Sequence, residues 1–94
     1  MVIRSNNIIA IPPGATIKEQ LIDRKMSQKE FASKMGMSEK HINKLIDGDV
    51  ALTDDVAIRL EMVLGLPARF WTNLESIYRE KIKKAQLDEL VNEG

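Results

Sequence analysis

The sequence predicts an all-α domain of five helices. Apolar residues recur at intervals of three and four along most of the chain, which is the spacing of one face of a helix. Small polar residues and glycines separate these stretches, at the places where helices begin and end. No alternation of apolar and polar residues is long enough to build a sheet. The 94 residues, of which 44% are hydrophobic, suffice for one small core and not for two.

Residues 1–14 are predicted to form an extended lead-in to the first helix. Pro12 and Pro13 stop a helix from extending backward, because proline disfavours helical geometry in the residue before it. The first helix is expected over residues 16–25, with Thr16 as its N-cap. Three apolar residues of the lead-in and three of this helix are predicted to pack on the rest of the domain. They are Ile8, Ile9, Ile11, Ile17, Leu21 and Ile22.

Two short helices joined by a tight turn are expected next. Ser27 and Glu30 form a capping box, in which the serine hydroxyl accepts a hydrogen bond from the amide three residues on. Gly36 ends the second helix, Ser38 caps the third and Gly48 ends it. The two helices with their glycine-containing turn predict a helix-turn-helix. Its inward residues are predicted to be Phe31, Ala32, Met35, Ile42, Leu45 and Ile46.

The fourth helix is predicted to begin after Thr53, an N-cap followed by two aspartates at the positive end of the helix dipole. Gly65 ends it, and Pro67 suits the first turn of a fifth helix. We assign the helical domain to residues 15–84 and a C-terminal tail or linker to residues 85–94. The apolar faces in this half of the chain are predicted to include Val56, Leu60, Val63, Leu64, Leu87, Leu90 and Val91.

The fifth helix carries three of the four aromatic residues. Phe70 and Leu74 are predicted to pack under the first and fourth helices. Trp71 is predicted to lie at a dimer contact, because tryptophan is enriched in interfaces and this core is small. Such a dimer would place the third helices of the two copies about 34 Å apart. The predicted dimer interface comprises Phe70, Trp71, Leu74 and Tyr78.

Composition excludes several classes of function. The absence of cysteine removes disulfides and thiolate chemistry, and a single histidine with no HExxH pattern offers neither a metal site nor a nucleophile–base pair. We therefore expect no enzyme activity and no cofactor. No apolar run approaches the roughly 20 residues of a membrane span, and the N-terminal stretch is too interrupted for a signal peptide. These features predict a cytoplasmic protein with no membrane partner.

Charge is balanced overall but unevenly distributed. Fourteen basic and fourteen acidic residues cancel, which argues against non-specific coating of nucleic acid. Residues 24–44 nevertheless have a net charge of +4, while the C-terminal part is acidic. This separation suits a protein with one side facing a polyanion, and it is also compatible with ordinary solvated helix faces. The basic residues of the window are Arg24, Lys25, Lys29, Lys34, Lys40 and Lys44.

The third helix is predicted to read DNA bases with its outward face. With Ile42 at the centre of the buried face and about 100° per residue, Lys40 and Lys44 point outward and Asn43 lies on a flank. Asparagine can bond adenine through two hydrogen bonds, lysine donates to guanine, and glutamate accepts from cytosine. The predicted base-reading residues are Ser38, Glu39, Lys40, Asn43 and Lys44.

The start of the second helix is predicted to hold the DNA backbone. Gln28 and Lys29 lie where free helix amides can bind a phosphate. Many short capped helices are simply solvated, and helix-turn-helix units also bind proteins. The residue spacing and the basic window favour DNA. The predicted backbone contacts are Ser27, Gln28, Lys29 and His41.

The segment SQKEFASKMGMSEKHINKLIDG resembles the helix-turn-helix of the Xre/Cro family of phage-repressor-like regulators. The flanking segments PPGATIKEQL, ALTDDVAIRLEMVLGLPARFWTNLE and YRE resemble HigA-type antitoxins, the antidote proteins of plasmid maintenance systems. The resemblance implies a five-helix lambda-repressor-like DNA-binding domain with a C-terminal helical extension. It also implies a homodimer that binds double-stranded operator DNA and represses its own operon. A RelE-like RNA-cleaving toxin is the implied protein partner.

Two departures leave alternatives open. GLPARFW lacks the Ser/Thr-Pro-Glu that precedes Phe-Trp in many short antitoxins, and it is similar to larger relatives that add a metallopeptidase-like domain. The tail KIKKAQLDELVNEG has no counterpart in the resemblance. The chain is therefore either an antitoxin, the DNA-binding portion of a larger regulator, or a phage-type repressor with no toxin partner.

Overall fold

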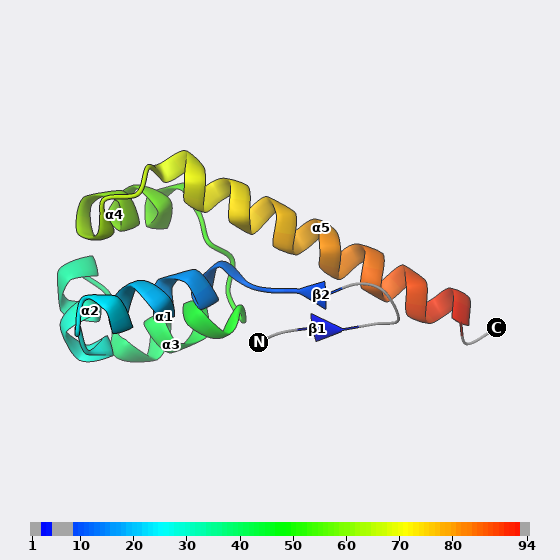
Figure 1. The fold of residues 1–94 in the computed structure, drawn as a ribbon, viewed down its shortest axis with the longest axis horizontal. Coiled ribbons are helices and arrows are strands. Elements are labelled where there is room, and N and C mark those ends of the chain that lie inside the picture. The colour runs from blue at the N-terminus through cyan, green and yellow to red at the C-terminus, as the bar shows by residue number, and fades with distance from the viewer. Residues whose placement is uncertain (1–2, 5–8, 93–94) are drawn as a thin grey trace.

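A computed structural model describes residues 3–4 and 9–92. This part of the chain forms the helices α1 (Pro13–Asp23), α2 (Gln28–Met35), α3 (Glu39–Asp47), α4 (Asp54–Leu64) and α5 (Ala68–Asn92). Two antiparallel strands of two residues each, β1 (Ile3–Arg4) and β2 (Ile9–Ala10), precede α1. Figure 1 shows a helical body from which α5 extends, with the small hairpin beside its projecting half. The predicted five-helix, all-α class is confirmed.

Local capping sets the lengths of α2 and α3, as predicted. The backbone amide of Glu30 donates to Ser27 Oγ at 3.0 Å, and that of His41 donates to Ser38 Oγ at 3.1 Å. Gly36, at the end of α2, has a left-handed φ of 69°. Because a residue without Cβ reaches that region at no steric cost, the chain can turn sharply from α2 into α3.

The first helix begins earlier than predicted. Its N-cap is Pro12, no side chain caps it, and Pro13 occupies its first turn. Proline suits that turn because its missing N–H has no partner there in any helix. The two prolines therefore start the helix instead of standing before it, and the predicted cap at Thr16 is wrong.

All five helices contribute to one core. The largest fully buried side chains come one from each helix: Ile17, Phe31, Ile42, Leu60 and Trp71. The predicted core position of Ile22 is wrong, since this side chain is 70% exposed. Ile17 and Leu21 already form the buried stripe of α1, and Ile22 lies about 100° further round the helix.

The helix α5 continues through the predicted domain boundary. Residues 85–92, predicted as a tail or linker, extend it without a break to Asn92. Ala85 is buried, whereas Leu87 is exposed. Packing of β2 on α5 supports this projecting part (Figure 1). No described helix combines the length and the apolar character needed to cross a membrane.

Only part of the lead-in packs as predicted. Ala10 is fully buried beside α5, whereas Ile11 is exposed. Ile9 belongs to β2 and pairs with Arg4 of β1. The predicted packing of Ile8 lies outside the described residues.

Candidate nucleic-acid interface

The helix α3 has two contrasting faces. Ile42, Leu45 and Ile46 are buried in the core. The other residues of its first two turns are exposed, and they carry cationic, amide and carboxylate groups. Four of the five residues predicted to read bases belong to this exposed set, and the fifth, Ser38, is the exposed N-cap of α3. The four are Glu39, Lys40, Asn43 and Lys44.

Close packing against α1 holds α3 in position. At Gly14, in the first turn of α1, a Cβ atom would lie 1.9 Å from the carbonyl oxygen of Ile46 and 2.3 Å from its Cα. Only glycine permits this approach of two backbones. The Pro-Gly sequence before the rest of α1 thus has a direct physical role, which is to seat the start of α1 on the last turn of α3.

Two arginines bind carbonyls at or just after the C-terminal ends of the two helices of the helix-turn-helix. Arg59 of α4 donates to the carbonyl of Met35, the last residue of α2, at 2.8 Å. Arg79 of α5 donates to the carbonyl of Val50, in the loop after α3, at 3.2 Å, and its Nε pairs with Glu75 at 2.8 Å. Cationic donors satisfy carbonyls that a helix end leaves free. The helices α4 and α5 therefore fix the C-terminal ends of α2 and α3.

Arg24 has a structural bond that sequence reasoning missed. This residue contributes to the basic window, but its Nη2 donates to the carbonyl of Leu64 at the end of α4, at 2.6 Å. Nothing local in the sequence signals that bond, because the partner lies 40 residues away. Arg24 is exposed but engaged in this bond, so the cations that the window leaves available to a polyanion are its lysines: Lys25, Lys29, Lys34, Lys40 and Lys44.

The residues predicted to hold the DNA backbone lie at the starts of α2 and α3. Ser27 and Lys29 are exposed and Gln28 is half-buried in the first turn of α2. His41 is exposed in the first turn of α3. Because α2 packs against α3, the two helix starts belong to one unit. Free amides at these starts suit phosphate oxygens.

Trp71 and Phe70 of α5 lie in the opposite environments to those predicted. Trp71 is fully buried in the core, with its ring 5.2 Å from that of Phe70 in an edge-to-face arrangement. The predicted dimer contact through Trp71 is therefore wrong, and Tyr78 is likewise buried. Phe70, predicted to lie under α1 and α4, is 36% exposed. Consecutive helix residues point about 100° apart, so only one of the two rings faces the core.

A regular spacing in α5 could have revealed this arrangement. Trp71, Tyr78 and Ala85 recur every seven residues, and all three are buried. Phe70 and Ile77 repeat at the same interval on a neighbouring face, and both are exposed. Leu74 is half-buried between the two faces.

Tyr78 joins α5 to the end of α3. A Cβ atom at Gly48, which follows α3, would lie 2.7 Å from the Tyr78 hydroxyl. Burial raises the pKa of Tyr78, against the opposing effect of the Arg79 guanidinium 5.0 Å from its ring centre. The Tyr78 side chain is therefore neutral, and it packs against the end of α3. Among the described residues, no three acidic or histidine side chains gather as a metal site requires.

A capped helix pair with a packed inner face and a cationic, hydrogen-bonding outer face defines the helix-turn-helix class of DNA-binding proteins. The chain belongs to the helix-turn-helix family HTH_3, whose model matches residues 17–71. Over 66 residues, 70% of each chain, it is 35% identical to the uncharacterised HTH-type transcriptional regulator YddM of Escherichia coli K12.

Two solved structures extend the similarity. An antidote protein of a plasmid maintenance system from Nostoc punctiforme is 31% identical, with a TM-score of 0.82 over 89% of this chain and 92% of that one. The Pseudomonas aeruginosa antitoxin HigA, solved with the higBA promoter, is 26% identical, with a TM-score of 0.78 over 87% and 90% of the two chains. The resemblance to HigA-type antitoxins is thereby confirmed.

Proposed function

We propose that this chain is a sequence-specific transcriptional repressor and the antitoxin of a type II, HigBA-like toxin–antitoxin system. The observation that carries the proposal is the exposed face of α3, on a helix whose other face is locked into the core. A structural neighbour of the same family type was solved with promoter DNA, which supports DNA as the ligand of this face.

In the proposed complex, α3 enters the major groove with its N-terminal half toward the bases. Asn43 bonds an adenine, while Lys40 and Lys44 donate to guanine acceptors. Ser27, Gln28 and the amides at the start of α2 bind a phosphate, which sets the register but carries no sequence information. Base contacts therefore provide specificity, and phosphate contacts provide orientation.

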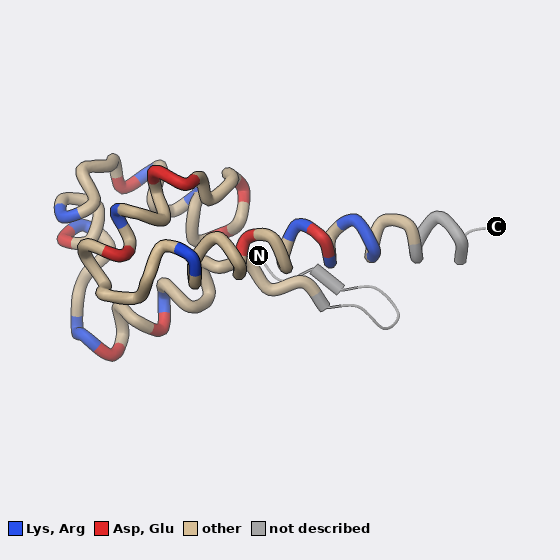
Figure 2. The backbone as a smooth tube through the Cα atoms, turned by 90° about the horizontal axis from the view of Figure 1, so that it is seen from above, with Lys and Arg blue, Asp and Glu red and all other residues tan. Residues whose placement is uncertain are grey.

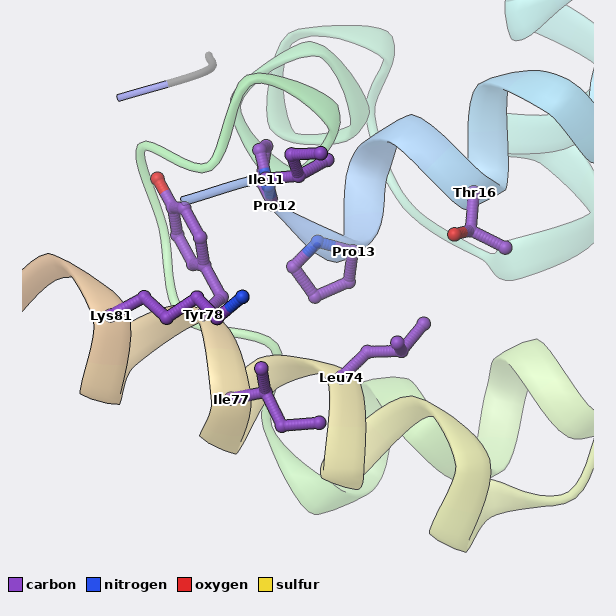
Figure 3. A pocket seen from close by; sticks show the side chains of 8 residues that line it. All are labelled: Ile11, Pro12, Pro13, Thr16, Leu74, Ile77, Tyr78 and Lys81. Atoms are coloured by element: carbon purple, nitrogen blue, oxygen red, sulfur yellow. The ribbon is translucent and has the colours of Figure 1, made fainter. Parts of the chain in front are cut away.

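We propose a homodimer that pairs through an exposed apolar stripe on α5. Phe70 and Ile77 are exposed and Leu74 is half-buried, at the spacing of one helix face. This stripe borders a hollow of about 210 Å³ between α5 and the start of α1, lined partly by Ile11 and Pro12 (Figure 3). A partner copy would cover this apolar surface, and two α3 helices about 34 Å apart would meet successive major grooves.

We propose an RNA-cleaving, RelE-like toxin as the protein partner. Binding of this toxin to the chain distinguishes an antitoxin from a phage-type repressor, which has no toxin partner. Co-purification of the chain with the toxin, together with loss of toxin-dependent mRNA cleavage, is the expected result.

Operator binding is the decisive test. Fluorescence anisotropy with the promoter fragment upstream of the gene, at about 150 mM salt, should give an affinity well above that of a scrambled fragment. Equal affinity for the two fragments contradicts the repressor proposal. The dimer is tested separately by light scattering, where Ile77→Asp should give a monomer and Lys83→Asp, an exposed change outside the stripe, should not.

A further inference from the structure

The helix α4 packs through one face and exposes the other. Its inner face supplies Leu60 and Leu64 to the core. On the opposite side, Ile58 and Met62 are 51% and 80% exposed, and acidic residues lie around them. We call this surface the outer α4 face and define it by the residues Asp54, Asp55, Ile58, Glu61 and Met62.

The apolar part of this face is a ridge beside a hollow. Ile58 and Met62 are four residues apart, so their side chains are neighbours on the helix. Next to them, Met62 and Val63 line a groove of about 230 Å³ whose far side is the end of α2. Its other lining residues are Ser33, Lys34, Met35, Gly36 and Arg59. Single exposed apolar side chains are common, but a paired ridge that continues into a groove is typical of a protein-binding surface. The flexible thioether of Met62 adapts to a partner's shape.

Carboxylates surround the ridge. Asp55 pairs with Arg59 at 3.1 Å, and this guanidinium is also bonded to a main-chain carbonyl. Glu61 accepts a hydrogen bond from the amide of Ala68 at 3.1 Å but has no ion-pair partner in the described part of the chain. Asp54 is exposed as well. Three carboxylates against Arg59 leave the outer α4 face negative, in contrast to the lysines of α3. Lys34 adds one positive charge in the adjoining groove, so the negative charge is concentrated around Ile58 and Met62.

We propose that the outer α4 face binds a basic protein whose lysines and arginines surround an apolar patch. The inference rests on the proposed antitoxin function and gives it a surface. An RNA-cleaving toxin needs cations to hold the phosphates of its substrate, so it has the charge that this face attracts. Charge complementarity speeds encounter and sets orientation, and burial of the Ile58–Met62 ridge holds the complex together.

The proposed surface lies away from the recognition helix. In Figure 1, α4 is at one edge of the helical body and α3 at the opposite edge, with α1 and α2 between them. α4 packs against α5 and α2. A protein bound to the outer α4 face therefore leaves the exposed residues of α3 accessible, and operator, chain and toxin form a ternary complex.

Calorimetric titration tests the ridge. The probe is the product of the small reading frame adjacent to the gene, purified with its nuclease activity abolished by substitution. Met62→Lys should weaken its binding at least about tenfold, because the change removes apolar contact and places a cation against cations. Ile22→Lys is the matched control, since Ile22 is similarly exposed but lies outside the outer α4 face. Wild-type operator affinity verifies that each variant is folded.

A second variant tests the charge. Glu61→Gln keeps an oxygen that can accept from the Ala68 amide but removes the negative charge. Probe binding should weaken several-fold at low salt, and the difference from wild type should vanish at about 1 M salt, where charges are screened.

The outcomes separate the surface from the function. Wild-type probe affinity in Met62→Lys overturns the proposed surface and leaves the antitoxin function standing. Failure of the wild-type chain to bind the probe overturns the antitoxin function itself. A fall in light-scattering mass in Met62→Lys without probe makes the face a contact between copies of this chain, and also overturns the proposal.

Discussion

Gly14→Ala tests whether backbone contact between α1 and α3 fixes the recognition helix. A Cβ atom at this position lies 1.9 Å from the Ile46 carbonyl oxygen, whereas carbon and oxygen normally approach to about 3.3 Å. The two helices must therefore separate by more than about 1 Å, which opens the packing around Ile17 and Ile42. Overpacking against yielding side chains costs about 1–3 kcal/mol. Because both contacts here are with backbone, we expect about 3 kcal/mol of lost stability.

The sign of the stability change in Gly14→Ala distinguishes helix propensity from backbone contact. Gly14 lies in a helix, so propensity alone predicts that alanine stabilises the fold by about 1 kcal/mol. Contact with Ile46 predicts a melting temperature lower by roughly 12–24 °C for a domain of this size. Thermal unfolding followed by circular dichroism measures the melting temperatures of the wild type and Gly14→Ala. Gly65→Ala is a comparison variant, because an added Cβ there meets nothing within 4 Å and its cost comes from the left-handed backbone alone. An unchanged or raised melting temperature in Gly14→Ala refutes the reasoning.

Three further outcomes are expected. Asn43→Ala should weaken cognate operator binding by about 1–3 kcal/mol and relax specificity at one base pair, with little loss on scrambled DNA; equal loss on both fragments contradicts base reading. Lys29→Ala should weaken binding to all sequences and reduce the salt slope by about 1, measured by anisotropy across a salt series, and an unchanged slope removes Lys29 from the phosphate contacts. Because burial raises the pKa of Tyr78, the stability tied to its neutral ring is complete below the unfolded pKa of 10.0 and is lost as pH rises through the folded pKa. The melting temperature should therefore fall more steeply above pH 10 in the wild type than in Tyr78→Phe, and parallel curves contradict this.

Features with local causes were predictable from the sequence. The serine caps at Ser27 and Ser38 and the glycine at Gly36 depend on atoms within a few residues, so their pattern is visible in a short window. These signals located α2 and α3 and, with them, the exposed face of the recognition helix. Whether that face reads DNA in this chain remains a prediction.

Features that depend on distant partners were not predictable in the same way. Phe70 and Trp71 are both large aromatics, so their residue type does not show which of them faces the core, and only the seven-residue recurrence of buried positions along α5 does. The bond from Arg24 to Leu64 joins the ends of two helices that are far apart in sequence. Pro12 and Pro13 can precede a helix or start one, and the close fit of Gly14 on Ile46 favours a helix that begins there.

Along the described projecting part of α5, basic residues surround Glu80 (Figure 2), and residues 85–87 carry no charge. Charge alone therefore did not distinguish helix from linker in residues 85–87. The heptad recurrence of Trp71, Tyr78 and Ala85 was the available signal, and it continues into the segment assigned as a tail. This recurrence indicates a buried helix face only if another segment of the chain packs on that face. The small hairpin beside α5 is that element, and two-residue strands leave too short a pattern to detect.

The side chains of Lys40, Asn43 and Lys44 make no hydrogen bond or ion pair within the described part of the chain. Their replacement therefore leaves the fold's own bonds intact, and under the proposed function it changes the operator that is recognised without repacking the core. Under the proposed function, the domain is a practical scaffold for laboratory selection of new operators, because a library that is confined to these three codons and excludes proline leaves the core and the helix caps unchanged.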